Sequence, residues 1–98
     1  MIGYDDLNKD MEILVNAWGD AGKRVIELCW ADPLKISMND YLKECTACGG
    51  NWGGMLLSGL KRLRPAIYEA IPDNMGSFAW VCICSTLELL GVDSKAEG

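Results

Sequence analysis

The chain of 98 residues contains no histidine. Histidine is the usual general base at neutral pH, the base of hydrolytic triads and the commonest imidazole ligand of metals, so ordinary hydrolytic chemistry is not expected. The carboxylates of the N-terminal third are spread around a polar helix face, and none of them is paired across a recognisable cleft. We therefore expect a protein that is not an enzyme and that uses no cofactor.

The sequence also lacks a membrane span and a secretory signal. Its longest apolar stretch, residues 78–87, ends at Glu88, whereas a bilayer span needs about twenty apolar residues. Charged residues begin at position 5, and no apolar segment precedes them. Five cysteines, an odd number, with no N-x-S/T site fit a reducing compartment. We expect a cytoplasmic protein that does not contact membranes.

Basic residues are few, with nine Lys and Arg against fourteen Asp and Glu and a net charge of −5. An acidic chain is poorly suited to nucleic acids or anionic membranes, which attract basic surfaces. One basic cluster exists: Lys61, Arg62 and Arg64 directly follow the uncharged segment 45–60. Nucleic acid is therefore not the expected partner.

No sustained period-2 alternation between turn residues is present, so strands are not expected. Half of the residues are apolar, which is enough to fill a core. The length fits one domain. The sequence thus predicts an all-α fold, a compact bundle of four to five helices over residues 1–98, with loose tails at about 1–3 and 93–98.

Apolar residues at alternating spacings of three and four predict one long N-terminal helix, at about residues 3–31. The seam that would pair this helix with a second copy contains Leu7, Met11, Leu14 and Trp18. Further apolar residues widen the face beyond a two-stranded seam, which favours packing within the bundle. Gly19 and Gly22 each cost about 1 kcal/mol in a helix interior, so this region is alternatively a break or a close-packing point.

Further helices are expected over residues 37–48, 54–63, 66–71 and 78–90. Ser37, with Asp40 three residues later, has the form of a capping box, and Ser77 can cap the last helix. Pro65 fits the first turn of the short helix, and Gly91 fits the position after the last one. Gly49 and Gly50 are expected to stop the 37–48 helix. Because its apolar residues lie on nearly every side, the last helix is expected to be buried in the centre.

Cys45 and Cys48, followed by two glycines, have the spacing of half a zinc knuckle. A closed site needs two more ligands, which without histidine must come from Cys29, Cys82, Cys84 or a carboxylate. On a helix, Cys82 and Cys84 would point to different sides. Burial of the thiols as small apolar side chains is the favoured interpretation, and a structural zinc domain remains an alternative.

The segment 49–54 has the glycine frame of a phosphate loop, but Met55 and Leu56 stand where Lys and Ser or Thr must follow. A glycine-rich connection between two helices is the preferred interpretation. This turn and the basic edge beside it form the expected partner surface. Its residues are Asn51, Trp52, Ser58, Lys61, Arg62 and Arg64.

The leading hypothesis is a non-enzymatic helical protein that binds another protein, either alone or as a homodimer. The high content of apolar residues and Trp, together with the absence of a recognisable set of catalytic residues, supports this hypothesis. The alternative is a helix-turn-helix regulator of nucleic acid, in which Ser58, Lys61 and Arg62 face a groove. Its connection is longer than usual, and its basic residues lie at the C-terminal end of the second helix, where they complement the helix dipole.

The stretches CTACGGNWGGMLLSGL, AIPDNMGSFAW and LELLGVD resemble small uncharacterised proteins encoded on bacterial conjugative transposons and related mobile elements. The resemblance covers about the C-terminal 60% of the chain. It implies a cytoplasmic bacterial accessory protein and carries no catalytic residues with it. Small acidic proteins of such elements often act by binding a host or element protein, which agrees with the leading hypothesis.

Overall fold

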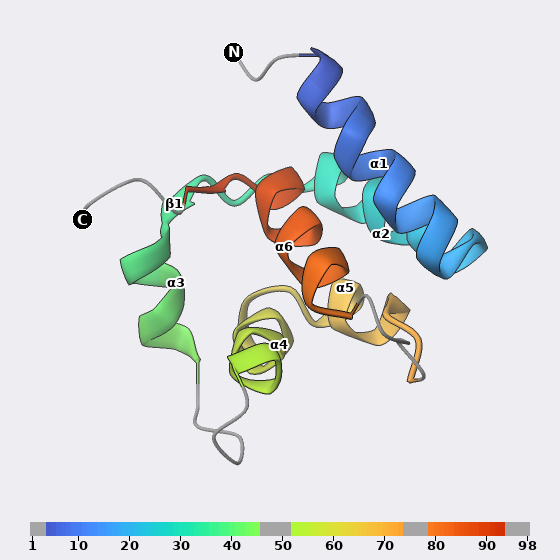
Figure 1. The fold of residues 1–98 in the computed structure, drawn as a ribbon. Helices are drawn as coiled ribbons and strands as arrows, with labels where there is room; N and C mark the ends of the chain where they lie inside the picture. The colour runs from blue at the N-terminus through green and yellow to red at the C-terminus, as the bar shows by residue number, and fades with distance from the viewer. Residues whose placement is uncertain (1–3, 46–51, 74–78, 94–98) are drawn as a thin grey trace.

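Six helices and two short strands make up residues 4–45, 52–73 and 79–93, which the computed structural model describes (Figure 1). For residues 4–8 and Trp52 only the backbone is described. Helices account for most of the described residues, which confirms the mostly helical class. The elements are α1 (Tyr4–Trp18), α2 (Asp20–Ala31), β1 (Ile36–Ser37), α3 (Met38–Glu44), α4 (Trp52–Leu63), α5 (Pro65–Ala70), α6 (Ala79–Leu90) and β2 (Val92–Asp93).

The expected single helix over residues 3–31 is wrong, because the chain breaks at Gly19 between α1 and α2. Gly19 has a φ of 59°, in the left-handed region that residues with side chains rarely adopt. Its N–H still donates to the Val15 carbonyl at 2.8 Å, and its carbonyl accepts from the Lys23 N–H at 3.2 Å. The backbone therefore turns sharply at one residue while its hydrogen bonds are kept. The bundle has six described helices instead of four to five for this reason.

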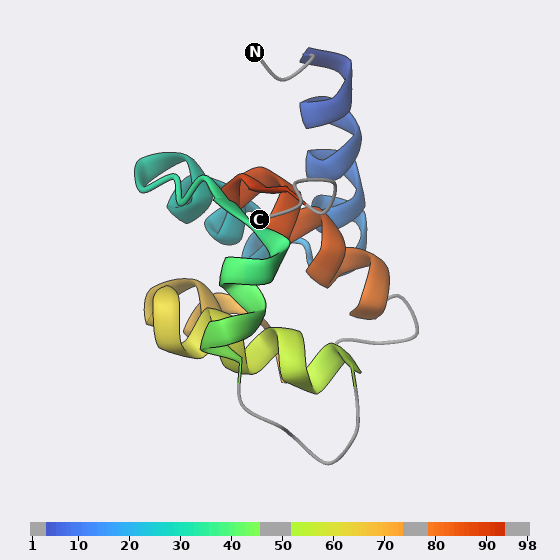
Figure 2. The same cartoon turned by 90° about the vertical axis from the view of Figure 1, so that its left-hand side faces the viewer.

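Gly22 allows α2 to pack against the backbone of α1. A β-carbon at this position would stand 2.6 Å from the Leu14 carbonyl carbon. The two helices are therefore in contact close to the turn, and they diverge away from it (Figures 1 and 2). Leu14 and Val25 have no exposed surface, so the predicted seam is closed within the chain.

Helix α3 begins as predicted and ends earlier. The Ser37 hydroxyl accepts a hydrogen bond from the Asp40 N–H at 3.1 Å, which confirms the predicted N-cap. The helix ends at Glu44 instead of about Cys48, because Cys45 adopts an extended conformation. The expected stop at residues 49–50 lies outside the described residues.

A two-residue parallel pair, β1 and β2, was not expected from the sequence. Ile36 aligns with Val92, and Ser37 aligns with Asp93. The segment before β1 is joined to the end of α6, because the Leu90 carbonyl accepts hydrogen bonds from the Leu34 and Lys35 N–H groups. A pair this short has no room for an alternating pattern. Asp93, expected at the start of a loose tail, instead belongs to β2, and residues 94–98 lie outside the described part.

Helix α6 contacts α1, α2 and α4 and occupies the middle of the molecule (Figure 1). Seven of its residues are buried: Cys82, Ile83, Ser85, Thr86, Leu87, Leu89 and Leu90. Its first turn reaches the surface, where Trp80 is 46% and Val81 is 40% exposed. The expectation of a helix buried on nearly every side therefore holds only after this turn. The Ser77 cap lies outside the described residues.

Helices α4 and α5 follow the prediction closely. Pro65 is the first residue of α5, and Ile71 ends it before Pro72. Leu56 and Leu60 of α4 are buried in the core with Ile67 of α5. No helix within the described segments is long and apolar enough to cross a membrane.

Candidate functional site

The predicted basic edge is engaged in contacts within the chain. Arg62 Nε lies 3.7 Å from a carboxylate oxygen of Glu44. Arg64 Nε lies 3.4 Å from the Asp32 carboxylate and donates to the Asp32 carbonyl, so it joins the start of α5 to the end of α2. Lys61 Nζ stands 5.6 Å from the centre of the Tyr68 ring. The exposed Arg62–Glu44 pair contributes little to stability, whereas the Arg64 side chain is only 23% exposed. Each of the three cations that were expected to meet a partner thus has a contact within the chain.

The other members of the predicted partner surface do not join this edge. Ser58 is only 9% exposed, and its hydroxyl donates to the Met55 carbonyl at 2.9 Å. The expectation that Ser58 shares an outward face with Lys61 and Arg62 is therefore wrong, because Ser58 is buried while the other two side chains are exposed. Asn51 and the Trp52 side chain lie outside the described residues. The burial of Ser58 also removes one of the three side chains expected to face a nucleic-acid groove.

The predicted dimer seam lies largely inside the molecule. Leu14 is fully buried, Trp18 is 8% exposed, and Met11 packs against the same core. The Leu7 side chain lies outside the described residues. Since α2 and α6 cover this face of α1, the seam is occupied by the chain's own helices.

Two of the four described cysteines lie in the core, and the other two are partly buried. Cys29 and Cys82 have no exposed surface. Burial raises the pKa of the Cys29 thiol to about 12 and also raises the pKa of Cys82. Cys45 Sγ donates to the Tyr41 carbonyl at 3.5 Å, and Cys48 lies outside the described residues. Within the described ranges, no three acidic or cysteine side chains are grouped as metal ligands would be.

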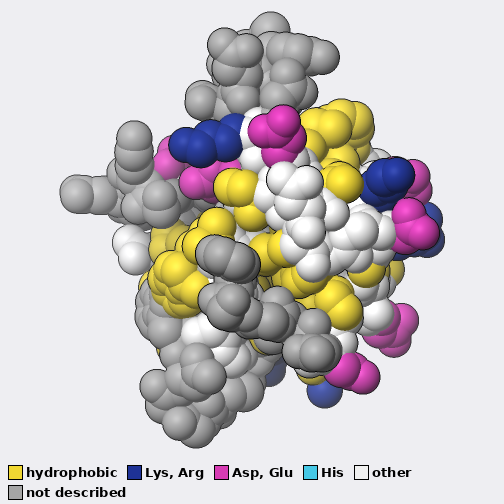
Figure 3. All heavy atoms as spheres, turned by 45° about the vertical axis from the view of Figure 1, so that its right-hand side comes forward, with side chains coloured by type: hydrophobic (Ala, Val, Ile, Leu, Met, Phe, Trp, Pro, Cys, Tyr) yellow, Lys and Arg dark blue, Asp and Glu magenta, His cyan; other side chains and the backbone are white. Residues whose placement is uncertain are grey.

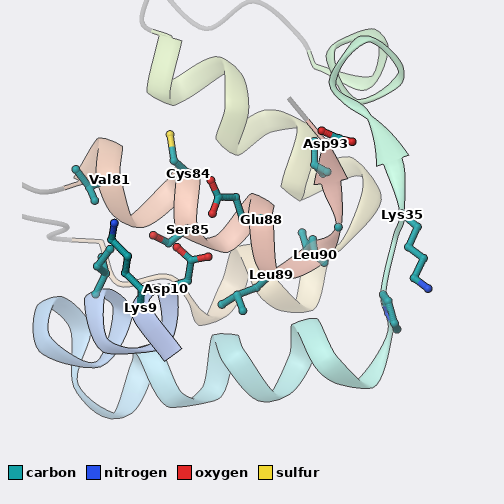
Figure 4. Close-up of a pocket in the computed structure, with 14 residues that line it drawn as sticks. Lys9, Asp10, Lys35, Val81, Cys84, Ser85, Glu88, Leu89, Leu90 and Asp93 are labelled. Carbon is teal, nitrogen blue, oxygen red and sulfur yellow. The ribbon is translucent and has the colours of Figure 1, made fainter. Parts of the chain in front are cut away.

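A groove of about 770 Å³ runs between α1 and α6, and it continues to the segment before β1 and to β2 (Figure 4). We call it the α1–α6 groove. Its apolar lining consists of Ile13, Pro33, Val81, Leu89, Leu90 and Val92. Pockets of this size with a mainly apolar lining are typical of binding sites.

Two polar groups lie within this apolar lining. Asp10 is 9% exposed and Ser85 is 3% exposed, although both line the groove. Figure 4 shows Asp10 projecting from α1 and Ser85 projecting from α6 into the space between the helices. Neither side chain makes a hydrogen bond or an ion pair in the described part of the chain. Neither side chain is among the fully buried polar groups without a partner, so their oxygen atoms still reach solvent through the groove. A segment that filled the groove would have to satisfy them, which makes this pair the most specific chemical feature of the groove.

Charged side chains border the groove. Lys9 and Lys35 lie towards its two ends, with Glu88 and Asp93 between them (Figure 4). Burial, with a smaller contribution from Glu88, raises the pKa of the Cys84 thiol. The groove thus combines an apolar lining, a buried acidic group and a charged border.

The groove is not apparent from the sequence because its two sides come from opposite ends of the chain. One signal was present. Asp10 precedes Leu14 by four residues and Trp18 by eight, which places an acid on the apolar stripe of α1. An acid on a buried stripe needs a partner or a function, and the earlier interpretation of the α1 carboxylates as solvated charge does not apply to Asp10.

Apolar side chains also reach the surface outside the groove. Trp30 is 53% exposed on α2, and Trp80 is 46% exposed beside Val81 on α6. On the face shown in Figure 3, hydrophobic side chains gather in the centre, and charged side chains lie mainly around the margin.

Comparisons of the chain with protein-family models, with curated proteins and with solved structures find no match.

Proposed function

We propose that this protein is a non-enzymatic interaction module that receives a segment of another protein in the α1–α6 groove. The observation that carries the proposal is the groove itself, which has a volume of about 770 Å³, an apolar lining and a charged border. An apolar centre surrounded by polar groups is the usual arrangement of a protein interface. A helix or an extended segment with two or three apolar side chains would fit such a groove.

The surface beside the groove supports a macromolecular partner over a small metabolite. Val81 lines the groove and is 40% exposed, and its neighbour Trp80 is 46% exposed. Their apolar surface continues beyond the groove, where a small ligand would leave it uncovered. Exposed Trp is strongly enriched among the residues that dominate binding energy in protein interfaces.

The protonation of the Cys84 thiol, which lines the groove, also supports a binding role. Cys84 has a raised pKa because it is partly buried and lies near Glu88, so the thiol form is favoured. The thiolate is the nucleophilic form, and catalytic cysteines normally have lowered pKa values. The resemblance to proteins of conjugative elements favours a partner encoded by the bacterial host or by the element.

Substitutions at exposed positions test the proposal without disturbing the core. Val81→Glu would put a charge into the apolar lining, whereas Asn16→Glu would put the same charge on an exposed part of α1 outside the groove. We expect affinity capture from the native host to recover a partner with the wild-type chain and with Asn16→Glu. Capture by Val81→Glu should fall at least about tenfold, because a buried, unpaired charge costs more than 1.4 kcal/mol.

Two measurements complete this test. Circular dichroism should give the same helix content for both variants, so that a loss of binding cannot be attributed to unfolding. Light scattering of the purified chain determines whether the bound segment comes from a second copy, in which case Val81→Glu would convert a dimer to a monomer. Equal capture of the same partner by all three proteins would contradict the proposed site.

A further inference from the structure

We infer that the segment bound in the α1–α6 groove places the guanidinium group of an arginine side chain against Asp10 and Ser85. This inference rests on the proposed function and adds the chemistry of the partner. Asp10 is 9% exposed and Ser85 is 3% exposed, and both line the groove. Neither has a hydrogen-bond or ion-pair partner among the described residues.

The Asp10 carboxylate is not among the fully buried side-chain atoms that lack a partner, so it keeps contact with solvent through the groove, and a segment that fills the groove removes this contact. A carboxylate that has left water without gaining a partner carries an unfavourable desolvation cost. A cation that reaches the groove removes this cost and gains a charge-assisted hydrogen bond. The Ser85 hydroxyl adds a second hydrogen-bond acceptor on the α6 side of the groove. The two residues therefore both present oxygen atoms that can accept hydrogen bonds from a cationic donor.

The remaining charges around the groove favour a cation at its centre. The lining contains three acids, Asp10, Glu88 and Asp93, and two bases, with Lys9 beside Asp10 and Lys35 at the other end (Figure 4). The net charge of −5 attracts a basic segment at longer range. A segment with a basic group at Asp10 therefore complements the groove, while an acidic group there would meet the Asp10 carboxylate.

Arginine fits this position better than lysine or a metal ion. A guanidinium group is planar and carries five N–H donors, so it can bond to a carboxylate and a hydroxyl at the same time. It is also less strongly hydrated than an ammonium group, and its aliphatic stem can lie on Ile13 and Leu89. A metal ion would need a set of ligands, and the described residues contain no group of three candidates.

Three short peptides test the inference against the full-length, isotopically labelled chain. The probes are acetyl-Leu-Arg-Leu-amide, the same peptide with uncharged citrulline in place of arginine, and the same peptide with glutamate. Amide chemical shifts, measured by NMR, report where each peptide binds. We expect the arginine peptide to shift amides of α1 and α6 with a Kd on the order of 1 mM, and to bind about tenfold more tightly than the citrulline peptide.

Variants identify the group that selects the cation. Asp10→Asn should remove the preference for arginine over citrulline, and Ser85→Ala should reduce it. Glu12→Gln removes an exposed acid of the same helix outside the groove and should leave the preference unchanged. Asp10→Asn should not lower the midpoint of thermal unfolding, since Asp10 has no described partner to lose. A purely structural role of Asp10 would lower this midpoint without changing the peptide preference.

The salt dependence separates Asp10 from the exposed acids. A buried ion pair is screened much less than a surface pair, so the preference for arginine should persist when the salt concentration is raised to about 0.3 M. Equal binding of the arginine and citrulline peptides, or no shift in α1 and α6 with any peptide, overturns the inference. The proposed function is judged separately, because capture of the partner that is lost in Val81→Glu would still support the groove as the binding site.

Discussion

Gly22 in α2 lies directly against the main chain of Leu14 in α1, with no space for a side chain between them. A β-carbon at position 22 would stand 2.6 Å from the Leu14 carbonyl carbon and 3.1 Å from the Val15 nitrogen. Both neighbours are backbone atoms, which cannot move aside as the end of a flexible side chain can. Any larger residue must therefore separate α1 from α2 or distort one of them.

The first prediction is that Gly22→Ala lowers the free energy of unfolding by about 3 kcal/mol, the upper part of the usual cost of overpacking. In an exposed helix interior the same substitution would stabilise the protein by about 1 kcal/mol. The sign of the change, measured by urea denaturation, therefore reports the contact. Lys23→Ala, at the exposed neighbouring position, is the control and should change the free energy by less than about 0.5 kcal/mol. A more stable Gly22→Ala protein would mean that the two helices do not touch here.

The second prediction concerns the break at Gly19, whose φ of 59° is combined with a ψ of −127°. No atom lies within 4 Å of a β-carbon at this position, so only backbone strain opposes a side chain. Gly19→Ala should lower the free energy of unfolding by about 1–3 kcal/mol. D-Alanine at position 19, introduced by chemical ligation, is the matched control because it prefers the mirror-image backbone conformation. If L- and D-alanine had equal effects, the positive φ at this residue would be contradicted.

The third prediction concerns the N-cap of α3. Ser37→Ala removes the oxygen that accepts the Asp40 N–H and should cost about 1 kcal/mol of unfolding free energy. Ser37→Asp should recover most of this loss, since Asp is an equally good N-cap residue. Asn39→Ala, an exposed substitution in the same helix, serves as the control in thermal or urea denaturation. Equal stability of the wild-type and Ser37→Ala proteins would show that the cap contributes nothing.

The fourth prediction links pH to the burial of Cys29. Burial raises its pKa from 9.0 to about 12, so between these values the folded state keeps a proton that the unfolded state has released. Stability from this group is complete below about pH 9 and decreases as the pH rises. From pH 8 to pH 10, the free energy of unfolding should fall by about 1.4 kcal/mol because of this thiol.

The Cys29→Ala variant isolates this contribution. Other groups with raised pKa values, such as Tyr41 and Cys82, contribute to the pH dependence of both proteins. The comparison is therefore between the pH slopes and not between the absolute stabilities, which also include the cost of the cavity. The slope above pH 9 should be smaller in Cys29→Ala. Identical slopes would indicate that Cys29 titrates normally in the folded protein.

The fifth prediction is that α1 does not form a coiled-coil dimer. Leu14 and Trp18 are 0% and 8% exposed, so pairing through this seam would require α2 and α6 to leave α1. Leu14→Ala should therefore cost about 2–5 kcal/mol of stability, as a large core truncation does, without changing the molecular mass in solution. Light scattering coupled to gel filtration measures the mass. A dimer that dissociated on Leu14→Ala while remaining folded would support the seam.

Local signals in the sequence predicted most helix positions correctly. Ser37 as a cap, Pro65 at the start of α5 and Gly91 after α6 act through backbone atoms within a few residues. Such effects are visible in a single sequence because donor and acceptor are neighbours along the chain. The same locality explains why the connection around Gly19 was misjudged.

The apolar spacing of residues 4–28 is compatible with both a single helix and a hairpin. After the turn at Gly19, α2 packs against α1 at the contact of Gly22 with Leu14, and its buried residues Val25 and Cys29 join the same core as Leu14. The period of apolar residues reports which side of a helix is buried, but it does not report what covers that side. The positive φ of Gly19 and the contact of Gly22 with the backbone of Leu14 distinguish the two arrangements.

The amino-acid sequence by itself determined that this protein is helical, where most of its helices begin and end, and that its composition offers no histidine chemistry. The tertiary structure decided that the basic edge is paired within the chain, that Ser58 is buried, and that Asp10 and Ser85 line one groove. The physical reason is distance along the chain. Caps, turns and periodicity depend on neighbouring residues, whereas the α1–α6 groove exists only because folding brings position 10 and position 85 to the same space.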